Sequence, residues 1–368
     1  MKKSLLALAL AAAAVGAQAA DVTLYGVVDE ALVYNKTKVN GEKNDTFGLE
    51  SGYNASSRFG IKGSEDLGNG LSVGFKLENG FNADTGSFGD SSRLFNREAA
   101  LTLKGGFGEV AFGRMGGLTS SAGTYDLFFA QADAFDGGAN GITTGFAMSD
   151  RYDNTITYAT PEVAGAKFYA QYSFQANGAE SNHSGDNNRY AALGASYQLG
   201  NLGLVGVVDS YMYGENPTGQ GSATAKSDKK GYTYNLGANY DFGMMKVFGA
   251  AQYMDNAPLF QGINEVTKKN SLQDGYALML GTQVPVAAGT LTAAAYYNDV
   301  EQSYTENKAA KYESNYYGLA ARYEYPLSTR TSLYTGAGYS QLKGEQAGNS
   351  KEYKKRVTEV YAGLTHAF

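Results

Sequence analysis

The sequence predicts an all-β protein, a 16-stranded antiparallel transmembrane β-barrel whose third long loop folds inward. Three observations predict it: segments that alternate polar and apolar residues, tight turns at near-regular intervals, and a composition with 48 Gly and 29 Tyr but only 5 Pro and no Cys or Trp. In such a barrel every second residue faces water, so a slightly polar mean hydropathy does not exclude the membrane.

The first residues have the pattern of a secretory signal peptide. Lys2 and Lys3 precede an apolar run over 5–15, and Ala17-Gln18-Ala19 forms a small-x-small cleavage site. The apolar run is shorter than the roughly 20 residues that a membrane-spanning helix needs. We therefore expect residues 1–19 to be a signal peptide, with cleavage after Ala19 or Ala20, and residues 20–368 to form the barrel.

Strict alternation is clearest over residues 234–242. Tyr234, Leu236 and Tyr240 occupy one parity, and Asn235 and Asn239 occupy the other. Similar alternation recurs over 71–78, 167–174 and 317–325. Period-two alternation indicates β-strands that have one apolar and one polar face.

Turn signals set the expected number of strands. Seven tight connections marked by Gly or Pro are expected, about 40 residues apart except across the segment 114–151. They are Leu67–Gly70, Gly105–Gly108, Pro161–Gly165, Gly200–Gly203, Asp241–Gly243, Pro285–Gly289 and Pro326–Ser328. Because each interval holds two strands and a longer loop, seven turns and eight loops predict sixteen strands, a number that leaves an aqueous channel.

Long polar loops are expected on the rim opposite the turns. Seven of them are placed at about 36–55, 79–93, 175–188, 212–231, 255–274, 299–313 and 342–355. The remaining loop, loop three at about 114–149, is long and rich in Gly, Asp and aromatic residues. We expect this loop to fold into the lumen and narrow the pore.

Charge and cysteine content exclude other classes. The net charge is −6 and becomes more negative once Lys2 and Lys3 are removed, which argues against nucleic acid as a partner. An exported chain without cysteine cannot be stabilised by disulfides, and a closed ring of hydrogen-bonded strands is an alternative source of stability.

Several stretches resemble Gram-negative general porins, most closely the neisserial and wider β-proteobacterial branch. The resemblance spans the mature chain and is carried by Asp21–Gly26, Ser57–Gly63, the Asn96-Arg97 pair, Leu103–Gly108 and the terminal Phe368. It implies an outer-membrane channel for passive diffusion of small hydrophilic solutes and ions, embedded in outer-membrane lipid and lipopolysaccharide. It also implies a homotrimer, and a Phe368 that the barrel-assembly machinery reads as an assembly signal.

A basic wall is expected in the lumen. Phe59 and Ile61 should face lipid, which turns Arg58 inward, because an Arg on the lipid face near the midplane costs about 2–4 kcal/mol. Lys76 has the polar parity of residues 71–78. Arg151 shares its parity with Asp153, Thr155 and Thr157, and we expect these four side chains to face inward.

Arg97 is harder to place by parity. An inward Arg97 puts Leu101 and Leu103 inside and Glu98 outside, so either a β-bulge near Ala99 or subunit packing would be needed. The family resemblance favours an inward Arg97, because the Asn-Arg pair looks like one that contributes to the basic side of the constriction.

The acidic side is expected on loop three, at Asp126, Asp133 and Asp136, with Asp29 as a further candidate. Asp133–Gly138 stands where the enterobacterial branch has Pro-Glu-Phe-Gly-Gly. Opposed charges across a narrow gap produce a transverse field that sets ion preference. Four basic residues (Arg58, Lys76, Arg97, Arg151) against about three carboxylates predict a mild anion preference.

Signals for an enzyme, a cofactor or a metal are weak. The two His, at positions 183 and 366, are expected in a solvated loop and at the lipid interface, where neither could serve a Ser-His-acid triad. The spacing of Asp133, Asp136 and Gly137 does not match a calcium-binding EF-hand loop.

Two other functions remain open. One is a substrate-specific channel, for phosphate or a sugar, and a sugar channel could use an aromatic slide made of Tyr125, Phe128, Phe129 and Phe135. A surface-binding barrel with a plugged pore would instead act through its loops.

Overall fold

The computed structural model describes residues 21–139, 141–214, 230–258, 271–304, 311–345 and 352–368. The expected signal peptide, 1–19, lies outside these residues. The strands are β1 (Thr23–Val39), β2 (Glu42–Ser51), β3 (Arg58–Gly68), β4 (Leu71–Asn82), β5 (Ser87–Phe88), β6 (Glu98–Gly105), β7 (Gly108–Gly116), β8 (Arg151–Ala159), β9 (Ala166–Ser173), β10 (Arg189–Leu199), β11 (Leu202–Met212), β12 (Gly231–Asp241), β13 (Lys246–Pro258), β14 (Ser271–Val286), β15 (Gly289–Tyr304), β16 (Lys311–Pro326), β17 (Thr331–Glu345) and β18 (Glu352–Ala367). Two short helices, α2 (Phe128–Ala132) and the 3-10 turn η1 (Ser184–Asp186), lie in loops.

These strands form a closed antiparallel barrel of sixteen strands, as predicted. β2 and β3 count as one barrel strand, because β2 pairs with the Glu30–Val39 part of β1 and β3 pairs with its Thr23–Val27 part. β5 is a two-residue strand beside the end of β4 and lies in a loop. The first and last strands close the ring, with Val27 to Val39 paired to Ala367 to Lys355.

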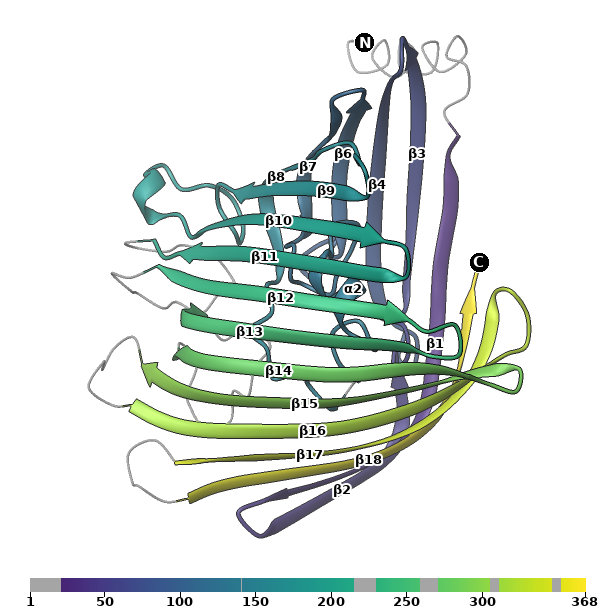
Figure 1. Cartoon of the computed structure of the whole chain (residues 1–368), viewed down its shortest axis with the longest axis vertical. Helices are drawn as coiled ribbons and strands as arrows, with labels where there is room; N and C mark the ends of the chain where they lie inside the picture. The colour runs from purple at the N-terminus through teal and green to yellow at the C-terminus, as the bar shows by residue number, and fades with distance from the viewer. Residues whose placement is uncertain (1–20, 140, 215–229, 259–270, 305–310, 346–351) are drawn as a thin grey trace, which may run out of the picture.

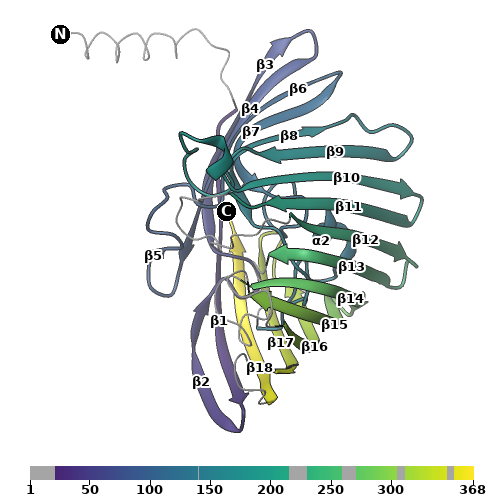
Figure 2. The same ribbon diagram turned by 90° about the vertical axis from the view of Figure 1, so that its left-hand side faces the viewer.

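The strands are steeply tilted relative to the barrel axis. In Figure 1, β10 to β16 cross the near wall at a large angle to β3 and β4, which form the far wall. Opposite walls cross in this way whenever strands of a closed barrel tilt by roughly 35–45°. Figure 2, a quarter-turn away, shows the helix α2 behind strands β12 and β13.

The alternation of the two faces is confirmed strand by strand. In β12, Leu236 is 70% exposed while its neighbour Asn235 is 2% exposed. In β18, Val360 and Leu364 are exposed, whereas Glu359 and Tyr361 are buried. Apolar side chains exposed on one face of every wall strand are what a lipid-facing surface requires.

All seven predicted turns are confirmed, since each falls between the end of one barrel strand and the start of the next. The loops expected at about 255–274, 299–313 and 342–355 are shorter than predicted, because strands β13 to β18 extend into them, whereas the loop expected at about 175–188 lies between β9 and β10 as predicted. β14, β15, β16 and β18 each have 16 residues, although about 9–11 suffice to cross the hydrocarbon core. The second loop is displaced, since it begins after Asn82 and ends before Glu98.

The expected first loop, at about 36–55, is wrong. β1 and β2 continue as a hairpin that turns only at Asn40 and Gly41, whose φ angles are +50° and +105°. Asn-Gly with positive φ at both positions is the strongest sequence signal for a two-residue hairpin, because the twist of that turn matches the twist of the strands. The irregular stretch is instead 52–57, between β2 and β3.

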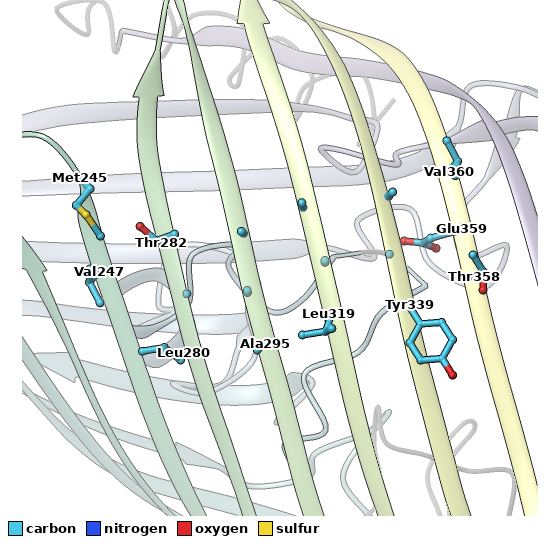
Figure 3. Close-up of a pocket in the computed structure, with 17 residues that line it drawn as sticks. Met245, Val247, Leu280, Thr282, Ala295, Leu319, Tyr339, Thr358, Glu359 and Val360 are labelled. Atoms are coloured by element: carbon cyan, nitrogen blue, oxygen red, sulfur yellow. The ribbon is translucent and has the colours of Figure 1, made fainter.

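A broad hollow of about 720 Å³ lies on the apolar outer face of strands β13 to β18 (Figure 3). Leu280, Leu319, Tyr339 and Val360 stand along it, and small side chains such as Ala295 form its floor. Because these residues have the exposed apolar parity, the hollow belongs to the surface that faces lipid or a neighbouring subunit.

Candidate functional site

The segment 117–150, which joins β7 to β8, is held at its root by a buried hydrogen-bond network. Thr119 Oγ1 donates to Asp209 Oδ2 at 2.7 Å and also contacts Ser149 Oγ at 3.0 Å. Thr233 and Tyr190 donate to the same Asp209 carboxylate, at 2.7 and 3.3 Å. Both ends of the segment are therefore tied to strands β10 to β12, which the sequence analysis did not anticipate.

From this root the segment follows the polar face of the wall. Helix α2 contacts β11, β12 and β13, and Asn239 Nδ2 donates to the carbonyl of Gln131 at 2.7 Å. Further along, the Gln252 side chain makes two hydrogen bonds to the backbone of Ala147, at 2.7 and 3.0 Å. Tyr316 donates to the carbonyl of Thr143 at 3.0 Å, so the contacts extend as far as β16.

Glycines in the strands make room for this segment. A Cβ added at Gly194 would lie 2.6 Å from Leu127, one at Gly281 would lie 2.8 Å from Ala134, and one at Gly318 would lie 2.7 Å from Ile142. Added Cβ atoms at Gly237 and Gly338 would lie even closer to Ala132 and Ile142, respectively. These glycines share the polar parity of their strands, a signal in the sequence that could have located the course of the segment.

Asp133, one of the predicted acidic residues, is almost fully buried and is used within the segment. Its carboxylate accepts hydrogen bonds from the backbone N–H groups of Phe135, Gly137 and Gly138 at 2.9–3.1 Å and from the Tyr296 hydroxyl at 3.0 Å. Burial raises the pKa of Asp133 in spite of these four donors. The side chain closes the turn that follows α2.

Asp126 and Asp136 lie close together on the same segment. Asp126 accepts from the N–H groups of Phe129 and Ala130, in the first turn of α2, at 3.3 and 3.1 Å. Asp136 is exposed, with φ at +55°. Burial, followed by the neighbouring Asp136 carboxyl, raises the pKa of Asp126 well above its usual value.

Asp29, the further acidic candidate, lies in β1 at the closure of the barrel. It is fully buried and accepts hydrogen bonds from Tyr334 Oη at 2.9 Å, from the Asn54 N–H at 2.9 Å and from the Thr365 hydroxyl. The Asp29 carboxylate thus joins β1 to β17, β18 and the 52–57 stretch.

The predicted basic residues gather around a carboxylate that the sequence analysis did not single out, Glu78. Arg97 Nε lies 2.7 Å from Glu78, and Arg58 and Lys76 each lie 3.8 Å from it. Lys76 also pairs with Glu98 at 2.7 Å. The Glu78 and Glu98 side chains are only 4% and 2% exposed, against 28%, 26% and 15% for those of Arg58, Lys76 and Arg97, so the cations cover the carboxylates.

The parity conflict at Arg97 disappears because β6 begins after it, at Glu98. Glu98 and Ala100 are buried on the polar face, and Leu101 is 53% exposed on the apolar face. The register between β4 and β6 runs without a shift from Ser72 to Glu78, so the bulge expected near Ala99 is absent from this ladder. Glu98, expected outside if Arg97 points inward, is therefore corrected to the polar face.

Arg151 does not share a face with Thr155 and Thr157, contrary to the parity expectation. A bulge intervenes, since Gly113 pairs with Thr155 but Met115 pairs with Tyr152. Asp153, inside this bulge, forms ion pairs with Arg93 and Arg114 at 2.9 and 2.7 Å. The Arg151 Nε is buried without a hydrogen-bond partner among the described residues, and Arg97 and Glu78 are close enough to act on it electrostatically.

Within the described part of the chain, no ion pair joins the basic group to Asp126, Asp133 or Asp136. The expected opposition of these two groups across a gap therefore remains a prediction. A cation that was missed, Arg322 in β16, lies over the Phe135 ring at 5.0 Å and is closer to the segment. The alternation over residues 317–325 puts Arg322 on the polar face, and this was the signal in the sequence that could have identified it.

The described residues hold no cluster of three His, Asp or Glu that could bind a metal ion. None of their helices is long and apolar enough to span a bilayer.

A wide closed barrel with an apolar outer face and a polar inner face defines the class of outer-membrane barrel proteins. A comparison with known proteins identifies the family. Residues 5–345 match the family model described as Gram-negative porin. The chain belongs to this family.

Individual relatives agree over the full length. The chain is 31% identical to an outer membrane porin protein of Bordetella pertussis, over 93% of this chain and 94% of that protein. It is 30% identical to outer membrane porin protein 32 of Delftia acidovorans, over 100% of both chains. Among solved structures, the anion-selective porin from Comamonas acidovorans has a TM-score of 0.64 and 26% identity, covering 95% of this chain and 100% of that one.

Proposed function

We propose that the protein forms a water-filled channel in the outer membrane, through which small hydrophilic solutes and ions diffuse passively, and that segment 117–150 lies in the bore and narrows it. One observation carries the proposal: the segment contacts buried side chains on the polar face of strands from β10 to β16. In a closed barrel that face surrounds the lumen.

The charge distribution supports a mild anion preference. Arg58, Lys76 and Arg97 are more exposed than the two carboxylates that pair with them, and Arg151 lies nearby. Three cations against two carboxylates leave a net positive charge where the wall meets water. The related structure from Comamonas acidovorans, described as an anion-selective porin, is consistent with this sign.

The purified protein in planar bilayers tests both parts of the proposal. We expect stable ohmic channels in KCl, and a reversal potential in a salt gradient that gives a chloride-to-potassium permeability ratio above unity. Absence of conductance would refute the channel, whereas clear cation selectivity would refute only the charge assignment.

The alternative of a sugar-specific channel loses the support of its proposed aromatic slide. Tyr125, Phe128, Phe129 and Phe135 are 0–7% exposed, because they pack between the segment and the wall. A surface-binding barrel with a plugged pore remains the second candidate, and the conductance measurement separates it from an open channel.

The assembly and setting of the channel are proposed on family grounds. We infer a homotrimer embedded in outer-membrane lipid and lipopolysaccharide, exported by a signal peptide over 1–19 and inserted by the barrel-assembly machinery through Phe368. A solved trimer form of the outer membrane protein OmpT of Vibrio cholerae, with 18% identity and a TM-score of 0.61, has the same fold. No catalytic role, cofactor or nucleic-acid partner is part of this proposal.

A further inference from the structure

Three residues of neighbouring strands stand in one row across the barrel wall. Arg322 of β16 pairs with Gly336 of β17, and Gly336 pairs with Tyr361 of β18. Directly opposite residues in antiparallel strands point to the same face. This is the polar face, since Ala320 and Glu359, two residues along from Arg322 and Tyr361, are buried there.

The middle position is open because it is glycine. A Cβ at Gly336 would overlap the Tyr361 hydroxyl, so the Tyr361 side chain leans over Gly336 toward Arg322. The hydroxyl group therefore lies over a position that has no side chain of its own, on the side toward Arg322, whose charge acts on it electrostatically.

Both groups have a hydrogen-bond donor without a partner among the described residues. Tyr361 is 2% exposed, and its hydroxyl makes no hydrogen bond to any described residue. The buried Nε of Arg322 is also without a partner there. Buried donors are normally satisfied, and two that flank one glycine on the same face indicate a place for an acceptor.

The surroundings hold both side chains in place. The Tyr361 ring packs against Tyr53 and Tyr334, with ring centroids 4.8 and 6.1 Å apart. The Arg322 guanidinium lies 5.0 Å from the centroid of Phe135, which belongs to segment 117–150. A site that is rigid before the ligand arrives loses little entropy on binding.

The nearby carboxylates are engaged elsewhere. Asp29 accepts from Tyr334, Glu324 from Ser332 at 2.6 Å, and the Oε2 atom of Glu359 from Tyr53 at 2.8 Å, while Glu359 Oε1 makes no hydrogen bond to any described residue. Asp133 accepts from four donors. In the described part of the chain, Arg322 forms no ion pair with any of them, which leaves its charge available to a solute. Glu359, next to Tyr361 on the same face, disfavours a ligand that carries two negative charges.

We propose that Arg322 and Tyr361, over Gly336, form a binding subsite for the carboxylate of a passing solute. A carboxylate is a planar monoanion that accepts two hydrogen bonds at once, one from the Arg322 guanidinium and one from the Tyr361 hydroxyl. The subsite rests on the proposed channel function. It gives solutes with one carboxylate a weak, saturable binding site in the lumen, in addition to any general anion preference.

Channel block by benzoate, with neutral benzamide as the matched solute, tests the subsite. In planar bilayers of the full-length protein in KCl, benzoate should reduce the chloride current saturably and benzamide should not. Arg322→Gln and Arg322→Lys should each raise the half-blocking benzoate concentration about tenfold, because Lys keeps the charge but lacks the Nε donor. Tyr361→Phe should raise the half-blocking concentration about threefold, because it removes one hydrogen bond to the carboxylate.

The control is Lys246→Gln, which removes another cation of the polar face, one that lies 5.0 Å from the Phe248 ring. Benzoate should block this variant at the same concentrations as it blocks the wild type. Equal block in wild type, Arg322→Lys and Tyr361→Phe would overturn the subsite and leave only general electrostatic attraction. Absence of benzoate block, or equal block by inorganic phosphate, would also overturn the carboxylate assignment, while normal KCl conductance in the same membranes would leave the channel function intact.

Discussion

At the scale of single residues, Glu78 and Glu98 determine how much positive charge the wall presents to water. They lie under Arg58, Lys76 and Arg97 at distances of 2.7–3.8 Å. Charge pairs of this kind leave only a residual field, because each carboxylate cancels part of the potential of its neighbours.

Glu78→Gln should therefore increase anion selectivity. The substitution keeps the shape of the side chain and removes a negative charge shared by three cations. We expect the chloride-to-potassium permeability ratio, obtained from reversal potentials, to rise on the order of twofold. Glu313→Gln, at an exposed position of β16, is the control and should leave the ratio unchanged. A fall in the ratio for Glu78→Gln would show that these cations do not face the ion path.

Asp126 makes the segment sensitive to pH. Because its pKa in the folded protein is raised above the ordinary value of 3.8, its protonated form favours the folded segment. The stabilisation is fully present at low pH and is lost as pH rises through the raised pKa. Hydrogen-exchange protection factors for residues 126–136 should therefore fall as the pH rises above the ordinary aspartate range. In Asp126→Asn this dependence should weaken, and the part that remains should come from Asp133, whose pKa burial also raises. Protection that does not change with pH in the wild type would contradict the assignment.

The period-two alternation predicted which face Arg58 and Lys76 occupy, but it could not predict which residues they contact. The inward expectation for Arg58 and Lys76 agrees with their contacts to the buried Glu78. The location of Arg97 depended on where β6 begins, and that of Arg151 on a bulge opposite Arg114. A one-residue shift of this kind reverses the face of a side chain and leaves almost no trace in composition.

At the scale of elements, the glycines on the polar face of the strands leave the space that side chains of segment 117–150 occupy. Gly237→Val should push α2 away from β12, because the new side chain would occupy the place of Ala132. If the segment lies in the bore, single-channel conductance should fall, by a factor on the order of two. Gly249→Val is the matched control, because a Cβ added at this strand glycine would have its nearest neighbour 3.9 Å away. This variant should conduct normally. Unchanged conductance in both variants would indicate that α2 is not beside the ion path.

Short elements were more predictable than the course of the long segment. The turns depend on local Gly and Pro residues, and all seven were located. The Asn40-Gly41 hairpin had an equally local signal, which the polar composition of 36–55 obscured. The segment is positioned by contacts between distant residues, such as Thr143 with Tyr316, and only the pattern of inward glycines hinted at them.

At the scale of the whole molecule, the ring closes along the ladder between β1 and β18, which ends at Phe368. The backbone N–H and C=O groups of Gly26 and Phe368 exchange hydrogen bonds of 3.1 and 3.0 Å, and the Phe368 ring covers Gly26. The number of strands could be predicted because regular turns leave few ways to close a ring. The sequence pattern does not contain subunit contacts, so the trimer remains a proposal.

Phe368→Ala separates barrel stability from assembly. The substitution keeps both backbone hydrogen bonds, so refolding into detergent in vitro should be close to that of the wild type. If the terminal aromatic is an assembly signal, the amount of folded protein in the outer membrane of expressing cells should fall several-fold. Phe242→Ala, which removes an exposed aromatic side chain at a turn, should assemble normally. Equal outer-membrane levels for both variants would contradict the assembly role.

The position of segment 117–150 in the bore can be measured directly, because the chain has no cysteine. Asp136→Cys places a single thiol at an exposed point of the segment, and Glu42→Cys places one at the start of β2, next to the β1–β2 hairpin turn. A bulky, charged thiol reagent added during single-channel recording should reduce the current in stepwise fashion through Asp136→Cys and leave it unchanged through Glu42→Cys. Complete labelling of Asp136→Cys with no change in current would show that the segment lies outside the ion path.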